Sequence, residues 1–219
     1  MYLIKIGGGK AINLKGVITD IASLNEKIII IHGANAARDE LADKIGFKKK
    51  VVTSLSGYDS VLSDETTIDL MMMTYAGLKN KRIVELCQQH GINAVGLSGL
   101  DGKTIQGKRN SGIKVREGGK TLLLRDFSGK PKSINKDLLN LLLNNGYTPV
   151  LSVPLIDENN FAINSENDDI LALLQSEFKA DKVISLIEEP GFLLDKNDPS
   201  TLVSNLSKEE LEAMEQKVD

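Results

Sequence analysis

Hydrophobic residues follow two patterns along the first 45 positions of this chain, continuous runs and helix-spaced stripes. The runs at residues 2–6 and 27–31 predict strands that are buried on both faces. Between them, Asn13 can cap a helix, whose apolar residues recur at helical spacing: Leu14, Val17, Ile18, Ile21, Ala22 and Leu24. A second helix is expected at about residues 36–45. This strand–helix order predicts a parallel sheet that is covered by helices.

The pattern is less regular in the middle of the chain. Residues 48–63 are polar and predict no regular element, whereas residues 66–89 predict a long helix that ends at Gly91. Residues 93–97 form the next buried run. After it, glycine turns separate short β-type runs, which cover residues 103–106, 112–116 and 121–124. These runs predict β-hairpins around residues 103–128 rather than another crossover unit.

The last third returns to alternating strands and helices. We expect strands at residues 147–153 and 182–186, and helices at residues 135–144, 167–178 and 207–216. The last of these helices starts with a capping box, Ser207 followed three residues later by Glu210. The chain therefore predicts an α/β fold, with an open, mainly parallel sheet between helices. Its length of 219 residues allows one large domain or two small ones.

Composition and charge narrow the class of protein. The net charge of −3 does not favour binding to nucleic acid by bulk charge. No apolar run is long enough to span a membrane, and the apolar start is too short for a signal peptide, so we expect a cytoplasmic protein. The single cysteine, Cys87, excludes an internal disulfide, and its place in a helical stripe favours a core residue over a nucleophile.

Candidate chemistry begins at the glycine run Lys5-Ile6-Gly7-Gly8-Gly9, between a predicted strand and a helix. Glycines let backbone N–H groups approach a phosphate closely, and Lys5 lies where its ammonium can reach a transferred phosphoryl group. A tight turn beside a solvated lysine is the alternative. The run is not a Walker A loop, because Gly-x-x-x-x-Gly-Lys-Ser/Thr does not occur.

A second turn of the same kind is His32-Gly33-Ala34-Asn35, which follows the next predicted strand. Parallel strands end at one edge of a sheet, where ligands bind, so we expect the two glycine turns to meet there. His32 is also readily explained as a packed residue at the end of a strand.

A third group lies at the start of the helix predicted at residues 167–178, and comprises Asn164, Ser165, Glu166, Asn167, Asp168 and Asp169. These side chains can serve only as caps and partners of the helix dipole. They can equally orient a lysine or hold a magnesium–nucleotide.

In order along the chain, these segments resemble the amino-acid kinase family, in its acetylglutamate kinase branch. The resemblance covers all 219 residues and rests on Lys5-Ile6-Gly7-Gly8, His32-Gly33, Asn80-Lys81-Arg82-Ile83-Val84, the run from Gly96 to Gly102, Gly146-Tyr147-Thr148-Pro149-Val150, Ile163-Asn164 with Asp168, and Leu186 with Pro190-Gly191. Within the branch, the chain looks most like kinases that act on aminoadipate or glutamate attached to an amino-group carrier protein.

The resemblance implies a fold and a reaction. The family sheet lies between helix layers, and ATP donates its γ-phosphoryl group to a side-chain carboxylate. Residues 1–153 would bind the acyl amino acid and the phosphoryl group, and residues 154–219 would bind ATP, whose Mg²⁺ comes with the nucleotide rather than from a metal site of the protein. Pathways of arginine or lysine biosynthesis, a homodimer and a partner carrier protein are implied as well.

The resemblance also assigns roles to individual residues. Catalytic roles fall on Lys5, which would stabilise the transferred phosphoryl group, and Asp168, which would orient the catalytic lysines. The other assignments are phosphate and ATP binding for Gly7, Gly8 and Glu188, and acceptor binding for Gly33, Ala34 and Asn164.

Several positions depart from the family pattern. Val61 stands where an arginine grips the acceptor's α-carboxylate, and Arg38 is one cation that can replace it. Ala34 replaces a glycine, which a negative φ would accommodate, and Glu166 replaces an asparagine or aspartate. Family members run on for about 40 residues past the position of Asp219, a length that the resemblance implies rather than the general size of domains, and carry a second lysine there.

Three functions follow from these features. The first is an ATP-dependent kinase for an acylated or carrier-linked acidic amino acid. The second is a ligand-binding or regulatory member of the same fold that is impaired in catalysis. The third is a kinase that keeps the ATP half of the site but acts on a different small-molecule acceptor.

Overall fold

A computed structural model describes the chain except for residues 49, 54, 56–58, 118, 196 and 216–219. The chain divides into two compact units, Met1–Leu186 and Ile187–Asp219. The first unit carries the sheets and the candidate site, so most of the description concerns it.

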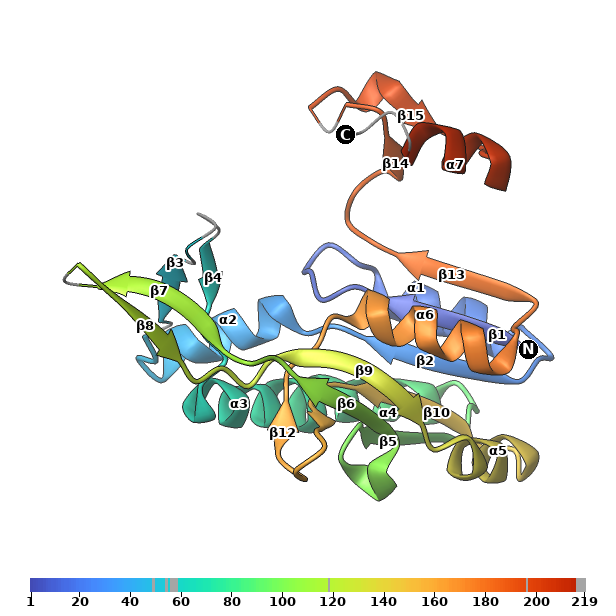
Figure 1. Cartoon of the computed structure of the whole chain (residues 1–219). Coiled ribbons are helices and arrows are strands. Elements are labelled where there is room, and N and C mark those ends of the chain that lie inside the picture. The colour runs from blue at the N-terminus through green and yellow to red at the C-terminus, as the bar shows by residue number, and fades with distance from the viewer. Residues whose placement is uncertain (49, 54, 56–58, 118, 196, 216–219) are drawn as a thin grey trace. The chain divides into compact units, whose positions relative to one another are not determined.

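The centre of the first unit is a five-stranded sheet in the order β13-β1-β2-β10-β5 (Figure 1). Every pair in it is parallel. The strands are β1 Tyr2–Ile6, β2 Ile28–His32, β5 Ala94–Ser98, β10 Thr148–Ser152 and β13 Lys182–Leu186. The predicted parallel sheet is therefore confirmed, and all five strands end at one edge.

Helices cover both faces of this sheet. Alternate side chains of each strand point to opposite faces, so the sheet has an apolar core on each side. Ile29 and Ile31 of β2 pack in one core with residues of α5 Lys136–Asn144 and α6 Asn167–Phe178. Ile28 and Ile30 pack in the other core with α1 Leu14–Ala22 and α4 Asn80–Gln89. Cys87 of α4 is wholly buried there, as predicted. The expected α/β architecture is confirmed.

The predicted long helix consists of three consecutive segments, α3 Glu65–Met71, the π-helical η1 Met72–Lys79 and α4. The side chain of Asp64 caps its start by accepting a hydrogen bond from the Thr67 N–H. Ile68 and Met71 of α3 belong to one core and Ile83 of α4 to the other. A π-helical stretch of this length is rare, and such stretches are frequent at functional sites.

Further strands form smaller sheets beside the main one. β12 Ala162–Ile163, β11 Leu155–Ile156, β6 Ile105–Arg109 and β9 Gly129–Ile134 form a four-stranded sheet in that order. β7 Ile113–Glu117 and β8 Lys120–Leu124 form an antiparallel hairpin, which confirms the hairpin prediction in this part. β6 does not join a hairpin with β7. It pairs antiparallel with β9, a strand that the sequence pattern did not predict.

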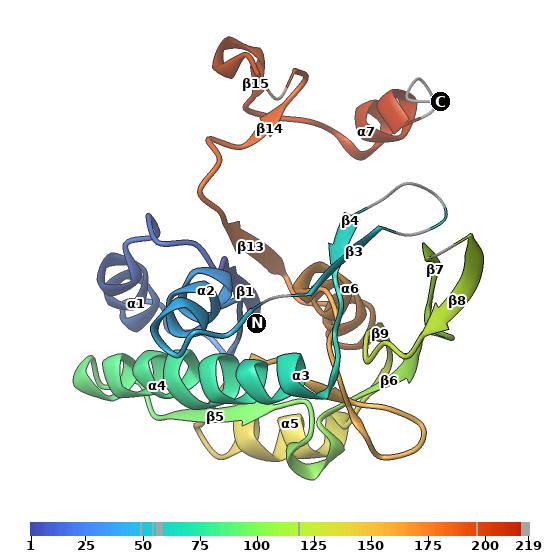
Figure 2. The same ribbon diagram turned by 90° about the vertical axis from the view of Figure 1, so that its left-hand side faces the viewer.

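A second hairpin, β3 Val51–Thr53 with β4 Asp59–Val61, lies within the stretch that predicted no regular element. Both hairpins lie on the same side of the unit (Figures 1 and 2). They are joined by the hydrogen bond from the Leu55 N–H to the Lys114 carbonyl, at 2.9 Å, and by a small core of Val52, Leu62 and Val115. This packing between distant segments stabilises β3 and β4, and a local pattern does not reveal it.

Of the remaining helices in the first unit, the two predicted before residue 46 are confirmed, whereas the short one after β5 was not predicted. The Asn13 side chain caps α1 by accepting from the Gly16 N–H at 3.1 Å. α2 Asn35–Lys44 follows β2, and the short helix η2 Asp101–Lys103 follows β5. None of the helices in the described part of the chain is long and apolar enough to cross a membrane.

The second unit contains short elements only. β14 Phe192–Leu193 pairs with β15 Leu202–Val203, and η3 Pro199–Thr201 lies between them. In α7 Lys208–Glu215 the predicted capping box is confirmed. The Ser207 Oγ accepts from the Glu210 N–H at 3.1 Å, while the Ser207 N–H donates to the Glu210 carboxylate at 2.7 Å.

Candidate functional site

Two glycine turns meet at the edge where β1 and β2 end. A Cβ added at Gly8 would lie 2.6 Å from the Asn35 nitrogen and 2.8 Å from the Ala34 nitrogen. One added at Gly33 would lie 2.8 Å from the Gly8 nitrogen. The two turns are also joined by a hydrogen bond of 3.0 Å from the Ala36 N–H to the Gly8 carbonyl. Only glycine allows this approach at positions 8 and 33, so the predicted meeting of the two turns is confirmed.

Backbone N–H groups gather where the turns touch. The Gly7 N–H donates to the Leu186 carbonyl at 2.9 Å, so in this structure it continues the ladder between β1 and β13. Within the described residues, the N–H groups of Gly8 and Gly9 take part in no backbone hydrogen bond. They therefore stand as the donors of the first turn, next to the N-terminus of α2, whose dipole favours an anion.

Lys5 and Asp168 form an ion pair at the same edge. Lys5 lies on β1 opposite Ile31, and its side chain is only 13% exposed. Asp168 lies in the first turn of α6 and is 74% exposed. The pair brings together the two residues for which catalytic roles were predicted. It places an ammonium group beside the glycine turns, where a transferred phosphoryl group would need a positive charge.

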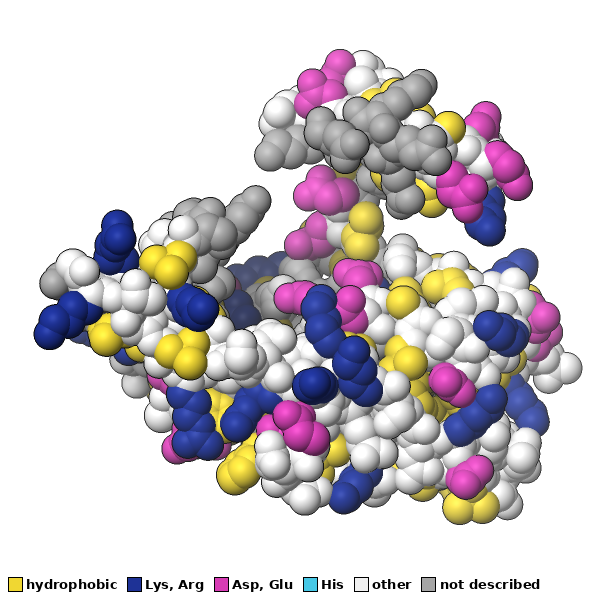
Figure 3. All heavy atoms as spheres, viewed as in Figure 1, with side chains coloured by type: hydrophobic (Ala, Val, Ile, Leu, Met, Phe, Trp, Pro, Cys, Tyr) yellow, Lys and Arg dark blue, Asp and Glu magenta, His cyan; other side chains and the backbone are white. Residues whose placement is uncertain are grey.

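Asp169, next along α6, forms a similar pair with Lys130 of β9, at 2.6 Å. This lysine is 59% exposed, and the side chain of Asp169 raises its pKa by hydrogen bonding. Figure 3 shows Lys and Arg side chains gathered over β9 and over the β7–β8 hairpin. The first turn of α6 thus holds one lysine from the main sheet and one from the smaller sheet.

The second glycine turn is held from inside the protein. His32 is wholly buried; its Nδ1 lies 3.2 Å from the Gly33 carbonyl oxygen and its Nε2 lies 3.1 Å from the Asn80 Nδ2. Burial lowers the pKa of His32 to about 4, and the charges of Lys79 and Lys81 act in the same direction. The ring is therefore neutral at physiological pH. His32 is thus a packed residue at the end of a strand, which was one of the interpretations from the sequence.

On its other side, the turn contacts the π-helical segment. The Tyr75 hydroxyl donates to the Asn35 side-chain oxygen. Burial raises the pKa of Tyr75, and the backbone of Ala34 opposes this effect, which places the Ala34 N–H near the hydroxyl oxygen. Ala34 is buried with φ of −151°, so its methyl group is accommodated without left-handed backbone. The departure from glycine at this position is explained.

Asn164 lies four residues before Asp168, where the chain enters α6. Its N–H donates to the Phe127 carbonyl at 2.7 Å, and its side-chain amide lies 3.5 Å from the Ser63 Oγ. The Ser63 N–H in turn donates to the buried Asp126 carboxylate at 2.9 Å. These bonds fix the amide beside the residues that follow β4.

The structure also places Val61, which departs from the family pattern, and Arg38, the cation that could replace the expected arginine. Val61 is half-buried at the end of β4, two residues before Ser63. Arg38 of α2 is 19% exposed and pairs with Asp39 at 2.9 Å, and its charge lowers the pKa of Tyr75 against the effect of burial. Arg38 is therefore a cation close to the second glycine turn. Glu188 belongs to the second unit, so its predicted contact with the nucleotide stays a prediction.

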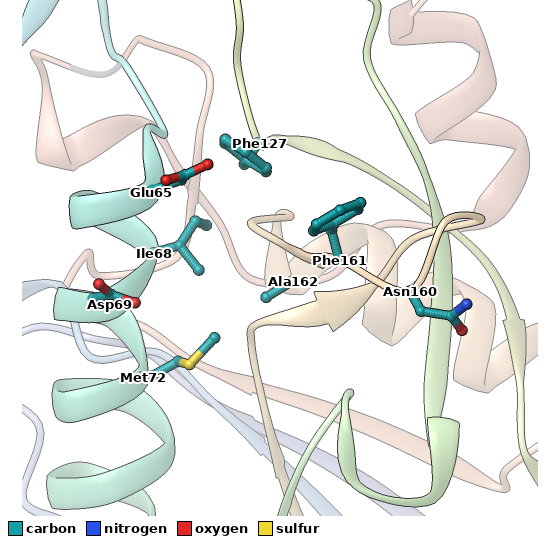
Figure 4. Close-up of a pocket in the computed structure, with 8 residues that line it drawn as sticks. All are labelled: Glu65, Ile68, Asp69, Met72, Phe127, Asn160, Phe161 and Ala162. Atoms are coloured by element: carbon teal, nitrogen blue, oxygen red, sulfur yellow. The ribbon is translucent and has the colours of Figure 1, made fainter.

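Two hollows are relevant to the site. One of about 180 Å³ adjoins the first glycine turn and is lined by Gly8, Gly9, Lys10, Ile12, Ala36, Ala37, Glu40 and Lys79. A larger one, of about 360 Å³, lies between α3 and the segments around Phe127 and Phe161 (Figure 4). None of the predicted site residues lines the larger hollow, so its size does not make it the centre of the chemistry.

Two further residues lie beside the glycine turns: Asn167, which the sequence placed in the group at the start of α6 without a role of its own, and Tyr75, which the sequence did not single out. The Asn167 amide nitrogen lies 3.4 Å from where a Cβ on Gly33 would sit, and its side-chain oxygen is buried without a hydrogen-bond partner. Tyr75 lies in the apolar stripe of the long helix and reads there as a core residue. The acidic run at the start of α6 pointed to the neighbourhood of Asn167, whereas no local signal distinguishes Tyr75.

The chain is similar to several known kinases over most of its length. The LysW-aminoadipate kinase of Thermus thermophilus is 39% identical over 216 residues, which are 97% of this chain and 80% of the relative. The acetylglutamate kinase of Methanopyrus kandleri is 31% identical over 217 residues, 99% of this chain and 83% of the relative. The carbamate kinase of Giardia has the same fold, with a TM-score of 0.64 at 12% identity, over 99% of this chain and 82% of its own.

The sequence profile of the amino acid kinase family matches residues 1–219, which is the whole chain. This chain belongs to the amino acid kinase family.

Proposed function

We propose that this chain is a kinase that transfers the γ-phosphoryl group of ATP to the side-chain carboxylate of an acidic amino acid, whose amino group is acylated or linked to a carrier protein. The observation that carries the proposal is the convergence of Lys5, paired with Asp168, on the edge where Gly8 and Gly33 pack together. The named kinases among the relatives support the same class of acceptor.

The residues present fit a bound nucleotide phosphate. A Cβ at Gly8 or Gly33 would clash with the backbone of the other turn, so the glycines let the two turns pack closely. Within the described residues, the N–H groups of Gly8 and Gly9 lack a backbone partner and are available to a phosphate. Bound ATP supplies the phosphoryl donor, with Mg²⁺ carried on its phosphates. The N–H groups of Gly8 and Gly9 would hold phosphoryl oxygens, and Lys5 offsets the negative charge that gathers when two anions are brought together.

The chain's own residues position the two anions and neutralise their charge, and they do not form a covalent intermediate. An acceptor carboxylate oxygen forms a bond to phosphorus as the bond from phosphorus to the β,γ-bridging oxygen breaks, which yields an acyl phosphate and ADP. Asp168 holds the Lys5 ammonium at this edge, and Asn164 holds the amide end of the acceptor. The acceptor and phosphoryl group would occupy residues 1–153, and the nucleotide would contact residues 154–219, including Glu188.

Val61 favours a second candidate, a kinase of this fold with a different acceptor. A valine cannot pair with a carboxylate, so an acceptor with a free α-carboxylate must meet another cation, for which Arg38 is placed near the second turn. The biosynthesis of lysine or arginine, a cytoplasmic location and a homodimer complete the proposal by analogy with the family.

The decisive experiment is an assay of ADP release with the chain and three kinds of acceptor: acetylglutamate, acetylaminoadipate and an amino acid linked to a carrier protein. In the presence of a productive acceptor, Lys5→Ala should lower kcat by about 100-fold or more while ATP binding changes little, because Lys5 acts mainly on the developing charge. No turnover with any acceptor would favour the impaired-member reading.

Lys130→Ala is the matched control for that variant. Lys130 also pairs with a carboxylate in the first turn of α6, but it comes from β9 and is largely exposed. Its loss should leave kcat within about twofold of wild type, since an exposed pair contributes little. Equal losses for both lysines would contradict the specific role of Lys5.

A further inference from the structure

The buried contacts of His32 define the position of its ring proton. The Asn80 amide nitrogen lies 2.9 Å from the Val150 carbonyl oxygen and 3.1 Å from His32 Nε2. The Asn80 side-chain oxygen accepts from the Lys81 ammonium at 3.2 Å, and this bond distinguishes the oxygen of the amide from its nitrogen. An amide nitrogen only donates, so Nε2 accepts and carries no proton. The proton of the neutral ring is on Nδ1.

This tautomer has a consequence for the second glycine turn. The Nδ1–H is directed to the Gly33 carbonyl oxygen, 3.2 Å away, and so draws that carbonyl toward the core. In a trans peptide, the C=O and the following N–H point in opposite directions. The Ala34 N–H is therefore turned away from the ring and donates to the Tyr75 hydroxyl oxygen, and the Ala34 nitrogen lies 2.8 Å from where a Cβ on Gly8 would sit.

We propose that His32 is a positioning residue, whose Nδ1–H, in the tautomer selected by Asn80, fixes the Gly33–Ala34 peptide between the core and the Tyr75 hydroxyl and so holds the second glycine turn against Gly8 at the phosphoryl-binding edge. His32 does not touch the ligand and transfers no proton; it acts through the peptide. The inference rests on the proposed function only in naming a phosphoryl group as the ligand of this edge.

Contacts with other strands of the sheet hold Asn80 in place. Lys81 also donates to the Gly96 carbonyl at 2.9 Å, and a Cβ on Gly96 would lie 1.9 Å from the Asn80 side-chain oxygen. Asn80 itself is wholly buried. The Asn80 amide therefore joins α4 to β2 and β10, and the Lys81 ammonium joins it to β5, so that Asn80 is held in one orientation.

The first test reads the tautomer directly. The chain has two histidines, so the ring nitrogens of ¹⁵N-histidine-labelled protein can be assigned with His90→Gln as the reference. At pH 7, long-range ¹H–¹⁵N spectra should show a protonated Nδ1 and an unprotonated Nε2 for His32. A proton on Nε2, alone or together with one on Nδ1, would overturn the proposal.

The second test compares two replacements that each keep half of the ring's contacts. His32→Asn retains an N–H donor near the Gly33 carbonyl, whereas His32→Gln retains an acceptor toward Asn80. We expect kcat to fall about 10-fold or more further in His32→Gln than in His32→Asn, with KM for ATP unchanged within about twofold, since misplacement of donors costs turnover. Equal kcat values in two folded variants would contradict the role of the Gly33 contact.

A third readout does not need turnover. Titration of labelled protein with Mg²⁺ and the non-hydrolysable ATP analogue AMP-PNP should shift the amide signals of Ala34 and Asn35, and His32→Gln should reduce the Ala34 shift by at least half. An unchanged shift in this variant would overturn the inference. If wild type lacks turnover but shows the tautomer and the shifts, the proposed function fails and the positioning role stands.

Discussion

The two glycine turns of the candidate site are built in opposite ways. The turn at Gly33 is buried and held by side chains, with His32 below its carbonyl and Tyr75 beside its N–H. The turn at Gly8 is partly exposed, and the hydrogen bonds that hold it come from the backbone, at Gly7 and at the Gly8 carbonyl. A turn that is held by buried side chains thus faces one that is held by backbone hydrogen bonds, although in the sequence both are glycine turns at the end of a strand.

The largest expected effect concerns the buried turn and its response to acid. Because the pKa of folded His32 is lowered to about 4 from an ordinary 6.5, the unfolded chain takes up a proton first as the pH falls. The stability linked to this neutral ring is present above pH 6.5 and is lost progressively between pH 6.5 and 4. The loss amounts to about 3 kcal/mol in the free energy of unfolding.

Urea unfolding of wild type and His32→Asn between pH 4 and 7 measures this loss. The wild type should lose about 3 kcal/mol more than the variant over the range, and His90→Gln shows what the other histidine contributes. Parallel curves for wild type and His32→Asn would mean that the turn is not held by a neutral buried ring.

Gly8→Ala tests the backbone-held turn. The added Cβ would lie well inside the van der Waals distance of the Ala34 and Asn35 nitrogens, so the two turns must separate. We expect a loss of about 2 kcal/mol in the free energy of unfolding and a reduction of Mg·AMP-PNP binding by about 10-fold or more. Calorimetry would measure both.

Gly46→Asn is the control for that substitution. Gly46 has a positive φ of 68° that asparagine tolerates, and no atom lies within 4 Å of its added Cβ. This control should keep ligand binding at the wild-type level. If Gly8→Ala behaved like it, the close packing of the two turns would not matter for the ligand.

The smallest expected effect on stability is that of Asp168→Asn. Asp168 is 74% exposed, and exposed ion pairs contribute less than about 1 kcal/mol to stability. Turnover should nevertheless fall about 10-fold, because Lys5 loses the partner that orients it. Stability from urea unfolding and kcat on one preparation would separate these effects; a large loss of stability with unchanged kcat would assign the pair to the fold rather than to the reaction.

Much of the fold follows from local pattern in the sequence. The buried runs of β1 and β2, the cap at Asn13 and the capping box at Ser207 each depend on neighbours within a few residues, and each is found. The meeting of Gly8 with Gly33 also follows, because parallel strands must end at one edge. The pairing of Lys5 with Asp168 came from the family resemblance, since 163 residues separate the two.

What the pattern did not reveal depends on distant contacts. The β3–β4 hairpin is stabilised by packing against Val115 of β7, and β9 depends on pairing with β6. Asn80 appears in the sequence as part of a helix, yet its amide determines the tautomer of a histidine 48 residues away. Such roles follow from geometry across the sheet, which spacing along the chain does not encode.

The π-helical segment of the long helix has a consequence for how this chain tolerates insertions and deletions. It joins α3, whose residues pack in one hydrophobic core, to α4, whose residues pack in the other. Each residue of a helix adds a fixed rotation about the helix axis, so the removal of one residue from η1 would turn one half of the helix relative to the other. After deletion of a single codon there, the apolar residues of α3 and α4 could no longer both face their own cores. The number of residues in η1 is therefore constrained by the packing of both cores.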